Sequence, residues 1–175
     1  MRMTLRATLI ATLTLGLAGL VEAQEKRVSP HESTSATIAG KKITIEYGRP
    51  YKKGRKIYGG LVPFGEVWRT GADEATKLTT EADLMVGDMH VAKGTYSLFT
   101  IPSEKGWTLI LNKVADQWGA FKYDQSQDLG RTPMKVTQRD APLEQLSITI
   151  ESAGDKGTLK VAWDQTVAAA DIMVH

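Results

Sequence analysis

Alternating apolar and polar residues predict short β-strands along the chain. Within residues 42–47, 146–151 and 159–164, every second side chain is aliphatic or aromatic. Successive side chains of a strand point to opposite faces of a sheet, so this period of two is typical of a half-buried strand. Residues 107–111 are apolar on both faces, as a strand covered on both sides would be, and residues 95–101 are mixed in the same way.

Turn-forming residues separate these predicted strands. Gly87 and Asp88 form a two-residue hairpin signal, and longer polar turns occupy residues 103–106 and 153–157. No window after residue 23 has a convincing helical period. Short strands with turns about every 8–12 residues are typical of antiparallel sandwiches and barrels. We expect an all-β fold, a single-domain antiparallel β-sandwich, because several strands are apolar on one face only.

One long segment does not fit the strand pattern. Residues Gly48–Glu66, called the basic loop below, contain five Gly and two Pro and show no sustained alternation. Long loops inside compact domains are uncommon and often functional. A second irregular segment covers residues 115–133. We therefore expect the chemistry of the protein to lie at the basic loop.

The N-terminal residues resemble a secretory signal peptide. Arg2 and Arg6 precede an uncharged, mostly apolar run over residues 7–20, and Ala23 stands at the expected cleavage position. The apolar run is shorter than the about 20 residues that a membrane-spanning helix needs. We predict a signal peptide over residues 1–23, a β-sandwich domain over residues 24–175, and export to the periplasm or the cell exterior, with no transmembrane segment after cleavage.

Charge and composition argue against nucleic-acid binding and against disulfide bonds. Removing the signal peptide lowers the formal net charge from +2 to +1, so nucleic acid is a poor candidate partner. The chain has no Cys. An exported protein without Cys has no disulfides, and its stability must come from burial and backbone pairing.

Several sequence segments resemble a known bacterial family. They are SPHESTSATIAGKKITIEYGRP, KGRKIYGGLVPFGEVWRTGADEATKL, KGTYSLFTIP, WTLILNK and QWGAFKY. Together they resemble the exported family called domain of unknown function 2911, from about Ser29 to Trp163. The resemblance implies an exported bacterial protein and is consistent with a β-rich domain, but it implies no activity and no catalytic residue. Two positions depart from the family pattern: Tyr51 replaces an expected small residue, and Asp73 replaces an expected Asn.

Motifs for metal sites and nucleophilic catalysis are absent from the sequence. His31, His90 and His175 have no ligand-pair spacing, and no HExxH motif occurs. Residues 124–130, DQSQDLG, begin like a calcium loop, but Leu129 stands where Gly is required, so we expect a solvated polar loop. A chain without Cys, GxSxG or SxxK offers no nucleophile motif. We expect no catalytic residue, no metal and no cofactor.

A basic, aromatic-rich cluster is the strongest positive signal. Its cations are Arg49, Lys52, Lys53, Arg55, Lys56 and Arg69, and its aromatic residues are Tyr47, Tyr51, Tyr58, Phe64 and Trp68. Guanidinium groups bind carboxylate or phosphate in bidentate fashion and stack on aromatic faces, so a small anionic or glycan-type ligand suits the mixture. The alternative is structural: the lysines are solvated, and the arginines tie the basic loop to Asp73, Glu74, Glu81 or Asp83.

We predict a ligand cleft built by the basic loop and the Trp68–Glu74 turn. The candidate ligand-binding residues are Arg49, Trp68, Arg69, Asp73, Glu74 and Trp118. The arginines would contact the anion, Trp68 and Trp118 would form apolar walls, and Asp73 and Glu74 would orient the arginines. Trp107 and Trp163 stand in strand patterns and are expected in the core.

The predicted function is a non-enzymatic binding or structural module of the bacterial envelope. The alternative is a hydrolase of envelope glycans that uses Glu74 or Asp73 as general acid or base. Glycosidases need two carboxylates roughly 5–10 Å apart. If both lie in one regular strand, Asp73 and Glu74 point to opposite faces and cannot form that pair together. Either one could instead pair with Glu66, Asp124 or Asp128, and the sequence does not choose among these.

Overall fold

The computed structural model describes residues 29–175, and these residues form an all-β structure. The strands are β1 (His31–Ile38), β2 (Lys41–Gly48), β3 (Ala72–Thr80), β4 (Leu84–Val86), β5 (Met89–Val91), β6 (Gly94–Ile101), β7 (Trp107–Asn112), β8 (Asp128–Ala153) and β9 (Lys156–Val174). A 3-10 helix at Gln125–Gln127 precedes β8. The described residues contain no α-helix, and none of their helices is long and apolar enough to span a bilayer. The predicted signal peptide lies outside the described residues.

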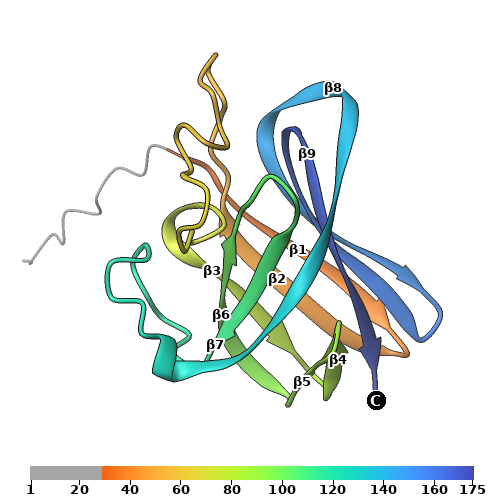
Figure 1. The fold of residues 1–175 in the computed structure, drawn as a ribbon. Coiled ribbons are helices and arrows are strands. Elements are labelled where there is room, and N and C mark those ends of the chain that lie inside the picture. Colours follow the sequence, from red (N-terminus) through yellow and green to blue (C-terminus); the bar gives the residue numbers. More distant parts are fainter. Residues whose placement is uncertain (1–28) are drawn as a thin grey trace, which may run out of the picture.

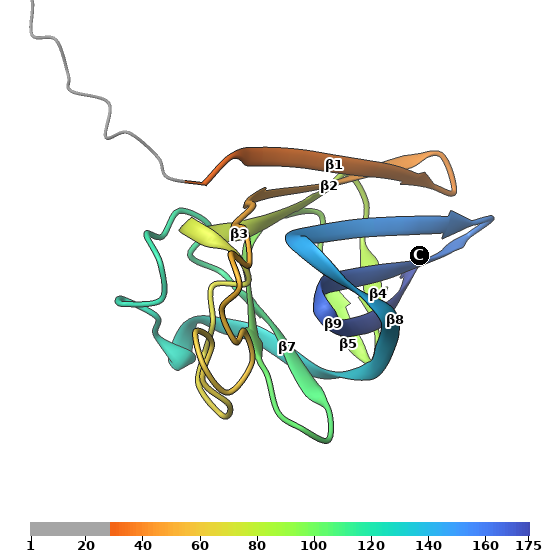
Figure 2. The same cartoon turned by 90° about the horizontal axis from the view of Figure 1, so that it is seen from above.

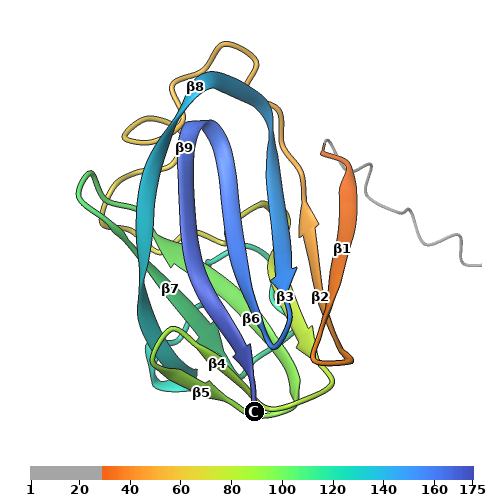
Figure 3. The same ribbon diagram turned by 90° about the vertical axis from the view of Figure 1, so that its right-hand side faces the viewer.

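The strands form one antiparallel sheet in the order β1-β2-β3-β6-β7-β8-β9-β4-β5 (Figure 1). The sheet curls without closing into a barrel, so that β1 and β2 lie on one side and β7 on the other (Figure 2). Strand β8 pairs with β7 through residues 128–134 and with β9 through residues 135–153, so it belongs to both layers. Figure 3 shows β8 arching over β9. The predicted antiparallel sandwich is thus confirmed.

Alternate residues of the predicted strands build the core. The buried residues include Ile43, Ile45, Tyr47, Leu146, Ile148, Leu159 and Val161. Trp107 and Trp163 are 3% and 1% exposed, which confirms that both belong to the core. Each fully buried aliphatic or aromatic side chain contributes about 1.5–3 kcal/mol relative to an exposed one. Apolar burial on this scale supports the fold of a chain that has no disulfide.

The basic loop is tied to the sandwich at both ends and near its middle. The backbone N–H of Leu146 in β8 donates a hydrogen bond to the carbonyl of Pro50 (3.0 Å), and Gly65 N–H donates to the carbonyl of Pro102 (2.9 Å). Between these points the side chain of Ile57 is fully buried. The loop therefore has a defined path over one end of the sandwich, where its side chains can help to form a site.

Candidate functional site

A cleft of about 770 Å³ lies between the basic loop and the start of β3. Its lining includes Tyr51, Lys53, Arg55, Leu61, Glu66, Trp68, Arg69, Asp73, Phe121 and Trp163. Both segments from which the sequence analysis built a cleft line this one. Its volume falls within the range of about 300–1,000 Å³ that is usual for small-molecule pockets.

Trp68 forms an apolar wall that is fixed in place by the core. Its backbone pairs with Thr100 of β6 through two hydrogen bonds, of 2.8 and 2.9 Å. Its ring stacks on Trp163 with a centroid distance of 6.2 Å and an angle of 15° between the planes, and it meets Tyr58 and Trp107 edge to face. Because such aromatic pairs hold each other in defined orientations, the buried Trp163 holds the Trp68 ring in place as a rigid wall of the cleft.

Arg69 enters the same cleft and makes no ion pair with an acid of residues 29–175. Its Nε donates a long hydrogen bond to the carbonyl of Gly71 (3.3 Å). A Cβ atom on Gly119 would lie 3.2 Å from Arg69 Nη1, so the absence of a side chain at Gly119 leaves room for the guanidinium. The half-buried guanidinium of Arg69 therefore has hydrogen-bond donors that no described residue accepts from.

Two of the acids considered as partners of Arg69, Asp73 and Glu74, lie against a histidine. Nε2 of His31 is 3.4 Å from Oδ2 of Asp73 and 3.2 Å from Oε2 of Glu74. Asp73 adopts a left-handed backbone conformation (φ 63°). Two adjacent residues of a regular strand would point to opposite faces. The left-handed backbone of Asp73 breaks this regularity, and the carboxylates of Asp73 and Glu74 both approach the imidazole of His31. Asp73 makes no ion pair with either arginine among the described residues.

Arg49 has a structural position outside the cleft. Its Nη1 lies 2.7 Å from Oε2 of Glu32 in β1, and its Nε donates to the carbonyl of Leu146 in β8 (2.8 Å). Arg49 thus connects two strands at the edge of the sandwich. Its partner Glu32 was not among the four acids considered from the sequence.

The remaining predicted residues lie beside the cleft rather than in it. Trp118 is 51% exposed, and its backbone bridges to Glu74. Both residues line a separate hollow of about 220 Å³. The aromatic side chain that this segment contributes to the cleft is Phe121, which is 84% exposed. Of the six candidate residues, the cleft contains Trp68, Arg69 and Asp73.

Phe121 is a cleft residue that the sequence did not single out, and Trp163 lies behind the cleft wall. QWGAFKY marked residues 117–123 as aromatic-rich, but the sequence could not tell which ring turns toward the cleft. The strand pattern around Trp163 predicted a core residue, and the side chain is buried. Its small remaining surface borders the cleft. A strand pattern identifies a buried face and cannot identify a residue at the boundary between core and cleft.

The charges around the cleft are mostly positive. Lys53, Arg55 and Arg69 line it, together with the acids Glu66 and Asp73. The Arg55 guanidinium is held by the basic loop itself, donating to the carbonyls of Tyr51 (2.5 Å) and Lys52 (3.0 Å). Three cations against two acids leave the lining with a formal excess of one positive charge, which favours an anionic ligand over a cationic one.

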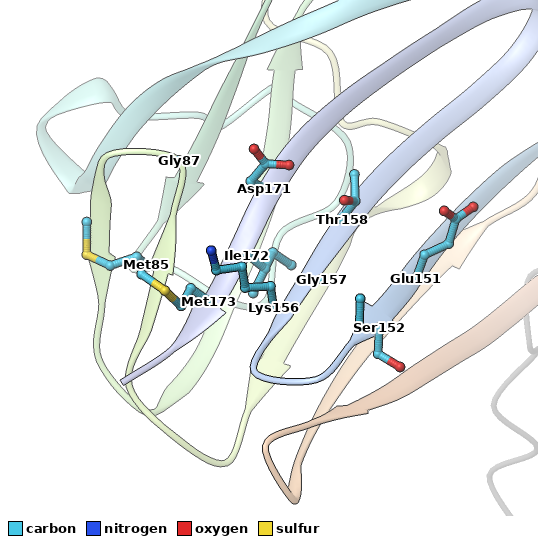
Figure 4. Close-up of a pocket in the computed structure, with 11 residues that line it drawn as sticks. Met85, Gly87, Glu151, Ser152, Lys156, Gly157, Thr158, Asp171, Ile172 and Met173 are labelled. Atoms are coloured by element: carbon cyan, nitrogen blue, oxygen red, sulfur yellow. The ribbon is translucent and has the colours of Figure 1, made fainter.

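A second groove, of about 510 Å³, lies between the β8–β9 turn and the paired ends of β4 and β9 (Figure 4). Its charged side chains are Glu151, Lys156 and Asp171. Glu151 is paired with Lys160 (2.6 Å). The groove has no aromatic wall, so it lacks the combination of rigid rings and an unneutralised guanidinium that distinguishes the first cleft.

The described residues include no group of three or more His, Cys, Asp or Glu side chains that could hold a metal ion. The chain belongs to the family described as protein of unknown function (DUF2911), whose profile matches residues 29–172. This match confirms the resemblance inferred from the sequence. No curated protein and no solved structure matches the chain significantly.

Proposed function

We propose that this protein is a non-enzymatic binding module whose cleft takes a small acidic sugar. The guanidinium of Arg69 binds the acid group of the ligand. Trp68 and Phe121 provide the apolar surface for the sugar ring, and the buried Trp163 supports Trp68 from the core. Lys53 and Arg55 add positive charge at the rim.

The observation that carries this proposal is the guanidinium of Arg69, which has no acidic partner among the described residues. Arginine presents five N–H donors in a planar fork that matches a carboxylate or a phosphate. In Arg69, only Nε has an acceptor among the described residues, and that hydrogen bond is long. Withdrawing a charge from water without a partner costs free energy. A bound anion would supply the missing acceptors and offset that cost.

The aromatic walls favour a sugar over a simple inorganic anion. The Trp68 ring is held against Trp163. The exposed ring of Phe121, from residues 117–123, also lines the cleft. Small-molecule sites combine such apolar walls with a few placed polar groups that fix orientation. A ring with one apolar face and one acid group matches both parts of this lining.

The proposed location is the periplasm or the cell exterior. The support is the pattern of residues 1–23, with two arginines, an apolar run and a small residue at Ala23. Mass spectrometry of the protein recovered from cell fractions tests the proposal. A mature chain starting at Gln24 is expected outside the cytoplasm, and an intact Met1 start in the cytoplasm would contradict export.

Thermal unfolding with a matched panel of sugars tests the binding function. We expect glucuronate and galacturonate to raise the Tm of the wild-type protein, and neutral glucose and galactose to do so far less. A ligand at 100 times its Kd stabilises the folded state by about 2.7 kcal/mol. Arg69→Ala should remove the response, and Arg49→Ala should keep it. An equal response of wild type and Arg69→Ala would refute the assignment.

A hydrolase of envelope glycans is the second candidate, because two carboxylates line the cleft. Glu66 and Asp73 are both part of its lining, whereas Glu74 is not. A glycosidase needs an acid and a base or nucleophile on the two sides of the scissile bond. The test is release of reducing ends from cell-wall glycan. Turnover that Asp73→Asn abolishes would favour the hydrolase, and binding without turnover favours the module.

A further inference from the structure

Two histidines and two methionines gather at the corner where β4, β5 and the end of β9 pair. This corner lies at the opposite end of the sandwich from the basic loop (Figures 1 and 3). In the sheet register, Met85 of β4 is the Cα partner of both His90 in β5 and Met173 in β9. The three side chains therefore occupy one row across three adjacent strands. The site is independent of the Arg69 cleft.

The row faces outward. The residues on either side of Met85 and His90 are buried, while His90 and Met173 are exposed. Of the four methionines in residues 29–175, Met89 and Met134 are only 6% and 3% exposed, but Met173 is 37% exposed and Met85 is half-buried. The two methionines with accessible side chains are thus next to each other, as Figure 4 shows.

His175 brings a second imidazole to the same place. Its ring centroid lies 5.8 Å from that of His90, and the two planes are tilted by 40°. Its backbone N–H donates a hydrogen bond to the carbonyl of Asp83 (3.1 Å), which holds the residue against the start of β4. The carboxylate of Asp83 accepts from Lys93 N–H (2.7 Å) and is engaged there.

The separation of the rings suits a shared metal ion. A metal–imidazole bond is about 2.0–2.1 Å, so two rings on one ion have their centroids roughly 5–6 Å apart. Directly opposed residues of an antiparallel pair have Cβ atoms about 4.5–5.5 Å apart, which puts the Met85 side chain next to His90. Methionine is unbranched and flexible, so its sulfur can adjust to a ligand with little strain.

We propose that His90, His175 and Met85 form a binding site for a copper(I) ion, with Met173 as a fourth ligand. Thioether sulfur is a soft ligand that selects copper(I), and imidazole binds copper well. Magnesium and calcium prefer oxygen ligands, which this row does not supply. The chain contains no Cys that would compete for the ion.

The test is competition for copper(I) under anaerobic, reducing conditions with bicinchoninate, which forms a coloured copper(I) complex. The purified protein is expected to remove one copper(I) ion per chain. Met85→Leu conserves the side-chain volume and should weaken binding at least tenfold, and the double variant His90→Asn/His175→Asn should abolish it. Circular dichroism checks that each variant folds.

Matched controls come from the same residue types elsewhere. His31→Asn and Met134→Leu should bind copper(I) as wild type does. Silver(I), which is stable in air, should perturb the NMR signals of the His90 and His175 rings and of the Met85 methyl group. Failure of the wild type to take copper(I) from bicinchoninate would overturn the proposal. So would undiminished binding by the double histidine variant, or by Met85→Leu.

Discussion

Arg49 and Arg69 are a matched pair of arginines whose substitutions should have opposite consequences. Arg49 makes an ion pair with Glu32 (2.7 Å) and a hydrogen bond to the Leu146 carbonyl (2.8 Å). Arg69 makes one hydrogen bond of 3.3 Å and no ion pair among the described residues. We predict that Arg49→Ala lowers stability and leaves ligand binding unchanged. Arg69→Ala should abolish ligand binding and leave stability almost unchanged.

The magnitudes follow from exposure and geometry. The side chains of Arg49 and Glu32 are 30% and 42% exposed, so solvent screening limits their ion pair to about 0–1 kcal/mol. The hydrogen bond from Arg49 to the partly buried Leu146 carbonyl adds about 1 kcal/mol. Loss of about 1–2 kcal/mol should lower the Tm by about 2–8 °C in a domain of this size.

Arg69→Ala should change the Tm by less than about 2 °C, because a hydrogen bond of 3.3 Å lies near the outer limit for such contacts. Removing the guanidinium also removes a cation that shares the cleft with Lys53 and Arg55. Thermal unfolding of both variants in one buffer without added sugar provides the measurement. If Arg69→Ala destabilises the protein as much as Arg49→Ala does, Arg69 is a structural tie and not a ligand-binding group.

Three further predictions test the packing and the titration of the domain. Gly48→Ala should cost at least about 3 kcal/mol in unfolding free energy, because a Cβ there would lie 2.0 Å from the Ala72 carbonyl oxygen. Gly54→Ala, which meets no atom within 4 Å but has a φ of 70°, should cost only about 1 kcal/mol, and equal losses in urea titrations would contradict this contrast. Tyr58→Phe should leave stability unchanged or raise it by about 1 kcal/mol, since the buried hydroxyl has no hydrogen-bond partner among the described residues; a loss above about 1 kcal/mol in the same assay would refute this. Burial, and then the hydrogen bond to Asp128 and its charge, raise the pKa of Tyr123 to about 12. A raised folded-state pKa gives stability that is present below about pH 10 and lost as the pH rises toward 12. Tyr123→Phe should therefore lose less stability than wild type between pH 9 and pH 12, whereas the exposed control Tyr51→Phe should follow wild type.

Local patterns predicted segments of β2, β6, β7, β8 and β9, because alternation within each segment marks the face that is buried. They did not predict β3, which begins at Ala72 within the expected Trp68–Glu74 turn. The alternation around Ile45, Ile148 and Val161 marks one buried face, and all three side chains are fully or almost fully buried. The single sheet with β8 shared between its layers could not be predicted in this way. Its order depends on which strands meet, and the period of two carries no information about partners.

The candidate site was predictable in its segments and only partly in its residues. The glycines and prolines of the basic loop identified an irregular, exposed segment, and that segment lines the cleft. The partners of each charge could not be predicted, because they lie far apart in the sequence: Arg49 pairs with Glu32 of β1, and Asp73 with His31. The approach of His90 to His175 likewise depends on sheet register, since the two residues have no ligand-pair spacing in the chain.

The central claim is that Arg69 is the anion-binding group of the cleft. Proton–nitrogen NMR of arginine Nε–H groups tests it most directly, with each signal assigned by the loss of one peak in Arg49→Ala or Arg69→Ala. On titration with glucuronate, the Arg69 signal should shift and saturate, whereas the Arg49 signal should stay in place. An unchanged Arg69 signal at saturating glucuronate, or a shift confined to Arg49, would contradict the account.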